Sequence, residues 1–269
     1  MRHAQPAGDR RSGMSRPPVA DRLELLALPA FPLVRPGDCL AELIARSARE
    51  NRVGLADDDV LVIAQKIVSK AEGRLRPLSD VEPSDEARRL AGATGKDARL
   101  VELILQESAA VLRLREHLLI TENRLGIVMA NAGIDRSNVE DGCALLLPVD
   151  PDRSAEDIRA GLKTRSGADL GVIVSDSIGR AWRNGVVGHA IGVAGIAALL
   201  DLRGASDLHG RRLEVTEIGV ADEIAAAASL LMGQAAEGKP VVLARGLCGL
   251  RGDGSARDLL RRRDRDLFR

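Results

Sequence analysis

Residues 60–74 read VLVIAQKIVSKAEGR, an apolar run followed at once by a polar segment. The run at residues 60–64 is typical of a buried strand. Ligand sites of α/β proteins gather just beyond the carboxyl ends of such strands. There, Lys66 and Lys70 can offset phosphate charge, and Gly73 allows the backbone to approach a ligand closely. A charged surface turn explains the same pattern equally well.

Patterns typical of strands and helices alternate on both sides of this segment. In chain order they indicate a strand and turn at 23–34, a helix after Asp38, helices within 86–114, a hairpin at 118–134, a helix from Ser154, strands at 170–174 and 214–216, a helix at 221–232 and a strand at 241–244. This alternation predicts a mixed α/β (α+β) fold.

We expect one main domain at residues 23–250, with a sub-domain boundary near residues 148–153, which read PVDPDR. The start of the chain contains Arg, Pro and Gly without an apolar stretch. Residues 1–22 are therefore expected to form a disordered tail and not a secretory signal. The Arg- and Asp-rich residues 251–269 are expected to form a polar, solvated C-terminal tail.

The composition excludes several classes of partner. The chain has 269 residues, in which 39 basic side chains balance 39 acidic ones, so no overall field favours nucleic acid or an anionic membrane. No apolar run approaches the roughly 18 residues of a membrane-spanning helix. Cys39, Cys143 and Cys248 form no CxxC pair and are expected to be buried thiols in a reducing compartment. We therefore predict a cytoplasmic protein that binds neither nucleic acid nor membrane.

Two glycine-containing motifs resemble nucleotide signatures but have the wrong spacing. Residues 92–96 read GATGK, which has too few residues between the glycines for a P-loop and no Ser or Thr after the Lys. Gly188, Gly192 and Gly195 lack the spacing of a dinucleotide fingerprint. Close packing against helices explains these three glycines better.

A second polar segment, residues 131–142, reads NAGIDRSNVEDG and follows the second strand of the expected hairpin. Small residues flank Asp135, and Asn138 lies about one helical turn further on. A carboxylate and an amide so placed can hold Mg²⁺ or Mn²⁺ together with a phosphate oxygen or a base edge. The alternative is an Asx-turn that caps a helix.

A third segment, residues 173–180, reads IVSDSIGR and ends an apolar strand with Asp176 and Ser177. A carboxylate and a hydroxyl at a strand end often bind Mg²⁺ that is attached to nucleotide phosphates. Arg180 and Arg183 can pair with a carboxylate or phosphate as planar forks. A polar strand end without a ligand is the alternative. Three such segments in one chain favour a joint site.

From about residue 23 to 250 the sequence closely resembles the coenzyme F420-0:L-glutamate ligase family, the gamma-glutamyl ligases that finish the deazaflavin coenzyme. The matching stretches are residues 31–34, 36–38, 65–74, 131–142, 174–180, 185–188, 220–225, 230–233 and 245–247. The resemblance implies a two-part fold in an interlocked homodimer, and a ligase that uses GTP and Mg²⁺ or Mn²⁺, with K⁺ as an optional ion. Its substrates would be coenzyme F420-0 and L-glutamate, and further gamma-linked glutamates could follow.

The resemblance also implies roles for individual residues. Those implied to contact GTP are Phe31, Pro32, Leu33, Val34, Gln65, Lys66, Lys70, Asn138, Met232, Gly233, Gln234, Ala235, Ala236, Glu237, Gly238 and Lys239. Asp135 and Asp176 are implied to hold a first metal ion, and Ser177 and Gln234 a second. Asp135, Asp176 and Lys70 are expected to carry catalysis. Some relatives have a carboxylate in place of Gln234, whose amide oxygen would bind the metal without a charge.

The implied reaction passes through an acyl phosphate. The terminal carboxylate of the acceptor would take the γ-phosphoryl group of GTP, and the amine of glutamate would then attack. No general base is evident from the sequence. One alternative is a related ligase with a different amino acid, acceptor or nucleotide. The other is a non-catalytic nucleotide- or cofactor-binding protein, which would not require both Asp135 and Asp176.

Overall fold

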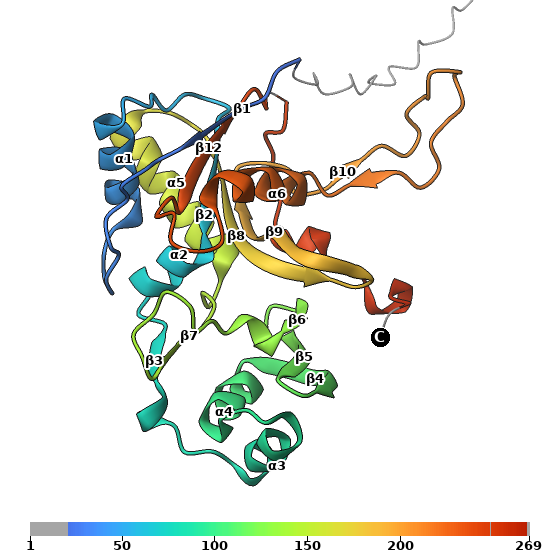
Figure 1. The fold of residues 1–269 in the computed structure, drawn as a ribbon. Helices are drawn as coiled ribbons and strands as arrows, with labels where there is room; N and C mark the ends of the chain where they lie inside the picture. Colours follow the sequence, from blue (N-terminus) through green and yellow to red (C-terminus); the bar gives the residue numbers. More distant parts are fainter. Residues whose placement is uncertain (1–20, 248, 268–269) are drawn as a thin grey trace, which may run out of the picture.

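The computed structural model describes residues 21–247 and 249–267 and is built around a five-stranded sheet (Figure 1). The strand order is β1 (Glu24–Ala27), β12 (Val241–Arg245), β2 (Val60–Ala64), β8 (Gly171–Arg180) and β9 (Arg183–Ala194). β2 and β8 are parallel, and the other neighbours are antiparallel. The strand predicted at residues 60–64 is confirmed, and it lies inside the sheet.

Helices cover both faces of this sheet (Figure 1). They are α1 (Leu40–Glu50) and α5 (Pro151–Ser166) on one face and α6 (Val220–Met232) on the other. β2 alternates between the two, because Leu61 and Ile63 join the core beneath α1 and α5, while Val62 joins the core beneath α6. Each such buried aliphatic side chain contributes about 2 kcal/mol to folding. The mixed α/β fold is thus confirmed.

Two glycines of β9 allow the helices to approach the sheet closely. A Cβ atom on Gly188 would lie 2.4 Å from the carbonyl oxygen of Ala225 in α6. A Cβ atom on Gly192 would lie 2.3 Å from the carbonyl oxygen of Pro151 in α5. No larger residue fits without moving backbone, which confirms that these two glycines serve helix packing.

The chain between the end of β2 and the start of α5 contains a separate core. The elements of this stretch of chain are α2 (Gln65–Ala71), β3 (Leu75–Pro77), α3 (Asp85–Thr94), α4 (Ala98–Gln106), β4 (Ser108–Arg115), β5 (Leu118–Asn123), β6 (Val128–Ala130) and β7 (Cys143–Leu145). Leu90, Ile104 and Leu119 are buried together in this core. The elements that carry them, α3, α4 and β5, lie below the main sheet in Figure 1. The hairpin predicted at residues 118–134 is present as β5 and β6. Gly95 caps α3 with a φ of 67°, so the GATGK motif is a helix end.

Two expected elements differ from the structure. Residues 108–114, expected to be helical, form β4, which pairs with β5 along its length. Pairing and burial against a neighbouring strand therefore override the helical propensity of this Ala- and Leu-containing stretch. The strand expected at residues 214–216 lies slightly later, as β11 (Glu217–Ile218), and pairs with β10 (Leu200–Asp201).

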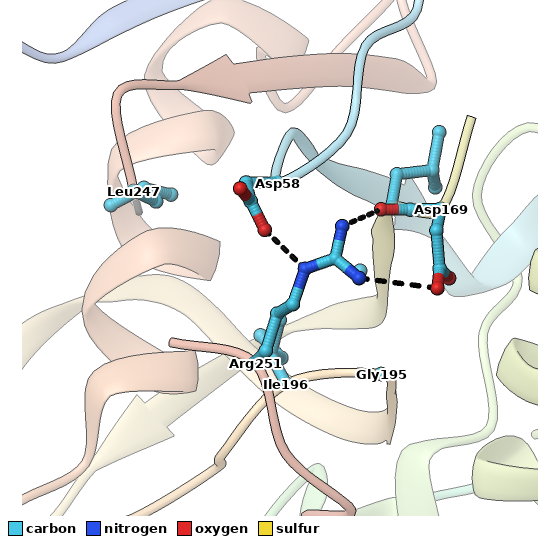
Figure 2. A pocket seen from close by; sticks show the side chains of 8 residues that line it. Asp58, Asp169, Gly195, Ile196, Leu247 and Arg251 are labelled. Carbon is cyan, nitrogen blue, oxygen red and sulfur yellow. Dashed lines mark hydrogen bonds and ion pairs between the residues drawn. The ribbon is translucent and has the colours of Figure 1, made fainter. Parts of the chain in front are cut away.

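The polar segment after residue 250 contacts the body of the protein at several points. Figure 2 shows Arg251 beside a small pocket, where its guanidinium group pairs with Asp58 and lies 3.2 Å from an Asp169 carboxylate oxygen. Further on, Arg263 lies 2.9 Å from the carboxylate of Glu122 in β5. These ion pairs hold the C-terminal segment against both the main sheet and the smaller core.

Some expectations fall outside the described residues. Residues 1–20, most of the predicted N-terminal tail, and Cys248 belong to that part of the chain. Cys143 is buried as predicted, but Cys39 is exposed, because it precedes α1 at the surface. Within the described ranges, no helix combines the length and apolarity that crossing a membrane requires.

Candidate active site

The candidate site forms where β2 ends beside the middle of β8. Ala64, the last residue of β2, pairs with Ser175, and Asp176 follows at once on β8. β2 leads directly into α2 without a loop. Because the two strands are parallel, the residues after Ala64 and after Ser175 meet at one edge of the sheet. The structure thus brings together two of the three segments that the sequence singles out.

Lys66 connects the third segment to this edge. Its Nζ atom lies 2.6 Å from Asp135 Oδ2 and 2.6 Å from Ser137 Oγ. Asp135 Oδ1 accepts hydrogen bonds from the backbone nitrogen of Ser137 at 2.7 Å and from its hydroxyl at 2.8 Å. The Asx-turn considered as an alternative is therefore present and orients Asp135 within the site, but it caps no helix, because the next element of the chain is β7. Ser137 has this role although the sequence assigns it none.

The local contacts determine the charge of Asp135. Burial raises the pKa of its carboxyl, but hydrogen bonds from Lys66 and Ser137 and the positive charge of Lys66 outweigh that effect. The pKa therefore lies below its usual value, and Asp135 is ionised at neutral pH. An ionised carboxylate is the form that binds a cation.

Asp176 has the opposite behaviour. The pKa of its carboxyl is raised to about 7. Burial is the largest cause and the nearby charge of Asp135 adds to it, against lowering contributions from Ser177, Lys66 and Gln65. The backbone nitrogen of Ser177 donates to Asp176 Oδ1 at 2.8 Å. Two carboxylates that repel each other indicate a place for a positive charge between them. A divalent cation would lower the pKa of both groups.

Gln65 has a buried donor without a protein partner. Its Oε1 accepts a hydrogen bond from Ser69 Oγ at 2.9 Å. Its Nε2 makes no hydrogen bond of standard length to any described residue, although the amide is near enough to Asp176 to lower the pKa of that carboxyl. Buried amide donors are nearly always satisfied in proteins. A ligand oxygen at this place would satisfy the donor.

Lys70 and Asn138 connect the site to the loop after α6. Lys70 Nζ donates to the carbonyl oxygen of Asn138 at 2.9 Å. Asn138 Nδ2 in turn donates to the carbonyl oxygen of Ala235 at 3.0 Å. Burial, together with the charge of Lys66, lowers the pKa of Lys70. Two ammonium groups one turn apart on α2 favour an anionic ligand, which would relieve their repulsion.

The loop between α6 and β12 and strand β8 each contribute one neutral oxygen group, Gln234 and Ser177. Ser177 Oγ donates to Gln234 Oε1 at 2.8 Å, so β8 and the loop meet here. Within the loop, Glu237 Oε2 accepts a hydrogen bond from the backbone nitrogen of Ala235 at 2.8 Å. Such backbone hydrogen bonds lower the pKa of Glu237. The loop is thus folded by its own contacts, and its residues 234–238 are exposed.

The donor atoms fit Mg²⁺ or Mn²⁺. Carboxylate, hydroxyl and amide oxygens are hard ligands of the kind that these ions prefer. Within the described ranges, no three His, Cys, Asp or Glu side chains gather in a group that could hold a metal ion. The protein therefore offers few charged ligands, as is usual where phosphate oxygens and water complete the coordination of Mg²⁺.

One predicted stretch is less closely joined to the site. Val34 is buried in the core beneath α1 and α5 and Phe31 packs against it, but Leu33 is 89% exposed. Within the described part of the chain, no hydrogen bond connects residues 31–34 to the site residues. The backbone nitrogen of Leu28 does donate to the carbonyl oxygen of Val241 at 2.9 Å. The stretch therefore begins near the loop that enters β12, and its contact with GTP stays a prediction.

The fold and site define a mixed α/β protein with an oxygen-rich, lysine-flanked site at a sheet edge. A family profile described as F420-0:Gamma-glutamyl ligase matches residues 30–246. The chain therefore belongs to the F420-0:gamma-glutamyl ligase family, as its sequence resemblance indicates.

Curated relatives match nearly the whole chain. A protein named Coenzyme F420:L-glutamate ligase from Methanothermobacter thermautotrophicus is 50% identical over 249 residues, which cover 92% of this chain and 99% of the relative. Proteins of the same name from Methanopyrus kandleri and Archaeoglobus fulgidus are 48% and 46% identical, with 92% of this chain and 98% and 97% of the relatives covered.

Proposed function

We propose that this protein joins L-glutamate to coenzyme F420-0 by an amide bond, using GTP and a divalent metal ion. The main support for the proposal is that Asp135 and Asp176, which belong to separate segments of the chain, lie near each other and beside Lys66 and Lys70. The names of relatives that are 40–50% identical support the choice of substrates. Further gamma-linked glutamates would be added by the same chemistry.

Amide formation in water requires an activated carboxylate. A carboxylate oxygen of the acceptor would attack the γ-phosphorus of GTP, and GDP would leave with the electron pair of the broken phosphorus–oxygen bond. The α-amine of glutamate would then attack the acyl carbon, and inorganic phosphate would leave. The proton of the amine would pass to solvent or to the departing phosphate. Holding the three reactants in line accounts for most of the rate enhancement.

The residues of the site have separate tasks in this scheme. Lys66 and Lys70 would bind the β- and γ-phosphates. Asp135 and Asp176 would hold one metal ion, and Ser177 and Gln234 would contribute oxygens to a second. When bound, the metal would stabilise charge on the transferring phosphoryl group. Because Lys66 now pairs with Asp135, its ammonium group would turn toward phosphate and free a carboxylate oxygen.

The proposal includes a homodimer. The segment from β10 to β11 projects from the body as a long arm (Figure 1). Leu208 is fully exposed on this arm, and Val215 is 82% exposed. Apolar side chains exposed on a projecting segment are typical of contact surfaces. A second copy of the chain would cover them.

The test is to incubate purified protein with F420-0, L-glutamate and Mn²⁺, with and without K⁺, and to measure product masses. We expect a product heavier by one or more glutamyl residues with GTP, and little product with Asp176→Ala. Product only with ATP, or with another amino acid, would indicate the related ligase of different specificity. GTP binding by calorimetry without GDP release would support a non-catalytic binding protein and overturn the proposal.

A further inference from the structure

The end of the β8–β9 hairpin has a surface that the reaction scheme does not use. Trp182, in the turn, is the only tryptophan of a chain without tyrosine, and its side chain is 86% exposed. Its φ is 64°, a left-handed value that hairpin turns usually assign to Gly or Asn. Tryptophan is mostly buried in folded proteins. A large ring held outward on a strained turn therefore points to contact with a ligand.

Two arginines close the same hairpin. Arg180 of β8 is the register partner of Arg183 of β9, and like charges at opposed positions destabilise a strand pair. Arg180 Nε is buried and has no hydrogen-bond partner among the described residues, and its Nη2 makes only a long contact of 3.4 Å with the Asn184 carbonyl oxygen. An anion between the two guanidinium groups would offset both costs.

We infer that this hairpin end binds the acceptor: Trp182 stacks on the flat deazaflavin ring, and Arg180 and Arg183 bind the phosphodiester of its side arm. The inference rests on the proposed function and adds an acceptor subsite to it. Aromatic side chains stack on planar ring systems of many kinds, and arginine forks match the oxygens of a phosphodiester.

The order of the groups along the acceptor agrees with the order of the residues along the hairpin. In an extended acceptor the phosphodiester lies about three bonds from the reacting carboxylate and the ring about ten, or roughly 4 Å and 12 Å. Along β8, Arg180 lies roughly 13 Å beyond Asp176 at the rise of an extended strand, and the turn with Trp182 follows. The long arginine side chains can reach back toward the site. The carboxylate of the acceptor would thus lie at the metal site, its phosphate at the arginines and its ring at the tryptophan.

A fluorescence titration tests the ring contact. Because Trp182 is the only tryptophan, its emission reports on this one position. We expect saturable quenching when F420-0 is added, beyond the absorption loss seen with free tryptophan. Leu114→Ala, which removes a half-exposed apolar side chain on β4 of the smaller core, should quench like the wild type. Quenching no greater than that of free tryptophan would overturn the inference.

Kinetics of three variants provide the second test. We expect Trp182→Ala to raise the KM for F420-0 about tenfold while the KM for GTP and kcat stay within about twofold, since stacking is lost but the reaction site is intact. Trp182→Phe should restore most of the affinity. Arg180→Gln combined with Arg183→Gln should also weaken acceptor binding and leave GTP binding unchanged.

The two tests separate the inference from the proposed function. If the wild type forms product and Trp182→Ala keeps the wild-type KM for F420-0, the acceptor subsite is wrong and the ligase function stands. If the wild type forms no product but F420-0 quenches Trp182 saturably, the subsite stands and the ligase function is wrong.

Discussion

The carboxyl group of Asp176 has two states that differ in their consequences for folding. Its ordinary pKa is 3.8, and burial raises the pKa to about 7 in the folded protein. The folded state therefore holds this proton more tightly than the unfolded chain does. This contribution to stability is complete below about pH 4 and is lost as the pH rises to about 7. At pH 8, without metal, the ionised side chain destabilises the fold by about 2–4 kcal/mol.

We predict that Asp176→Asn raises the midpoint of thermal unfolding at pH 8 by ~5 °C in metal-free buffer and has little effect at pH 4. The asparagine is neutral at both pH values, so the variant has no buried negative charge at this position at pH 8. Mn²⁺ should then stabilise the wild type and not the variant. Unfolding scans at the two pH values, with and without Mn²⁺, measure both effects. A variant less stable than the wild type at pH 8 would show that Asp176 has a satisfied structural role.

For single residues, the sequence predicts which side chains carry the chemistry, but it does not predict which side chains they contact. The lysines of α2 and the carboxylates Asp135 and Asp176 could be singled out because each follows a predicted strand. The roles of Ser137 and of the buried Gln65 amide could not, since they depend on side-chain geometry across separate segments. Trp182 could be named as rare, but only the structure shows that it is exposed.

The elements are positioned by close contacts that a pattern of apolar residues describes only indirectly. β9 lies against α6 at Gly188, where backbone atoms leave no room for a Cβ atom. This contact sets the distance between the sheet and the helix that leads into the loop with Gln234. The register of Ser177 against that loop therefore also depends on Gly188, which is the partner of Ser177 in the β8–β9 pair.

We predict that Gly188→Ala lowers the free energy of unfolding by about 1–3 kcal/mol, since the methyl group must push α6 away from β9. Urea unfolding followed by circular dichroism measures the change. Gly92→Ala in α3 is the matched control, because a Cβ atom there meets nothing within 4 Å. That control should be neutral or stabilising by about 0.5–1 kcal/mol. Equal stability of the two variants would contradict the packing role of Gly188.

Elements with strong local patterns could be predicted, and those set by pairing could not. β2 and the Ala-rich α6 lie where the apolar pattern places them. Residues 108–114 form β4 because β5 is available as a partner, and no local signal reports that partner. β11 lies slightly beyond the expected strand for the same reason.

The arm from β10 to β11 projects from the molecule and has exposed apolar side chains, which we expect a second copy of the chain to cover. We predict that Leu208→Asp combined with Val215→Asp turns the proposed homodimer into a monomer, because charges at these exposed sites would be desolvated on association. Light scattering coupled to size-exclusion chromatography measures the mass. Leu267→Asp, at another highly exposed leucine, is the control and should not change the mass. A monomeric wild type would contradict the dimer.

At this scale, the sequence predicts the fold class, and the family resemblance adds the site. The parallel pairing of β2 and β8 explains why segments about 110 residues apart share one sheet edge. The parallel pairing of β2 and β8 forms only in the complete fold. The sequence shows two apolar runs that could be strands, but it does not show that they are neighbours. The position of the 131–142 segment depends likewise on how the smaller core packs beside the sheet.

We propose that Asp135 and Asp176 together hold a metal ion that is bound to nucleotide phosphates. The most direct measurement is anomalous diffraction from crystals soaked with Mn²⁺ and a non-hydrolysable GTP analogue. We predict a manganese peak within coordination distance of both carboxylates, with Lys66 turned from Asp135 toward phosphate. Manganese bound elsewhere, while the Lys66–Asp135 ion pair stays intact, would contradict the claim.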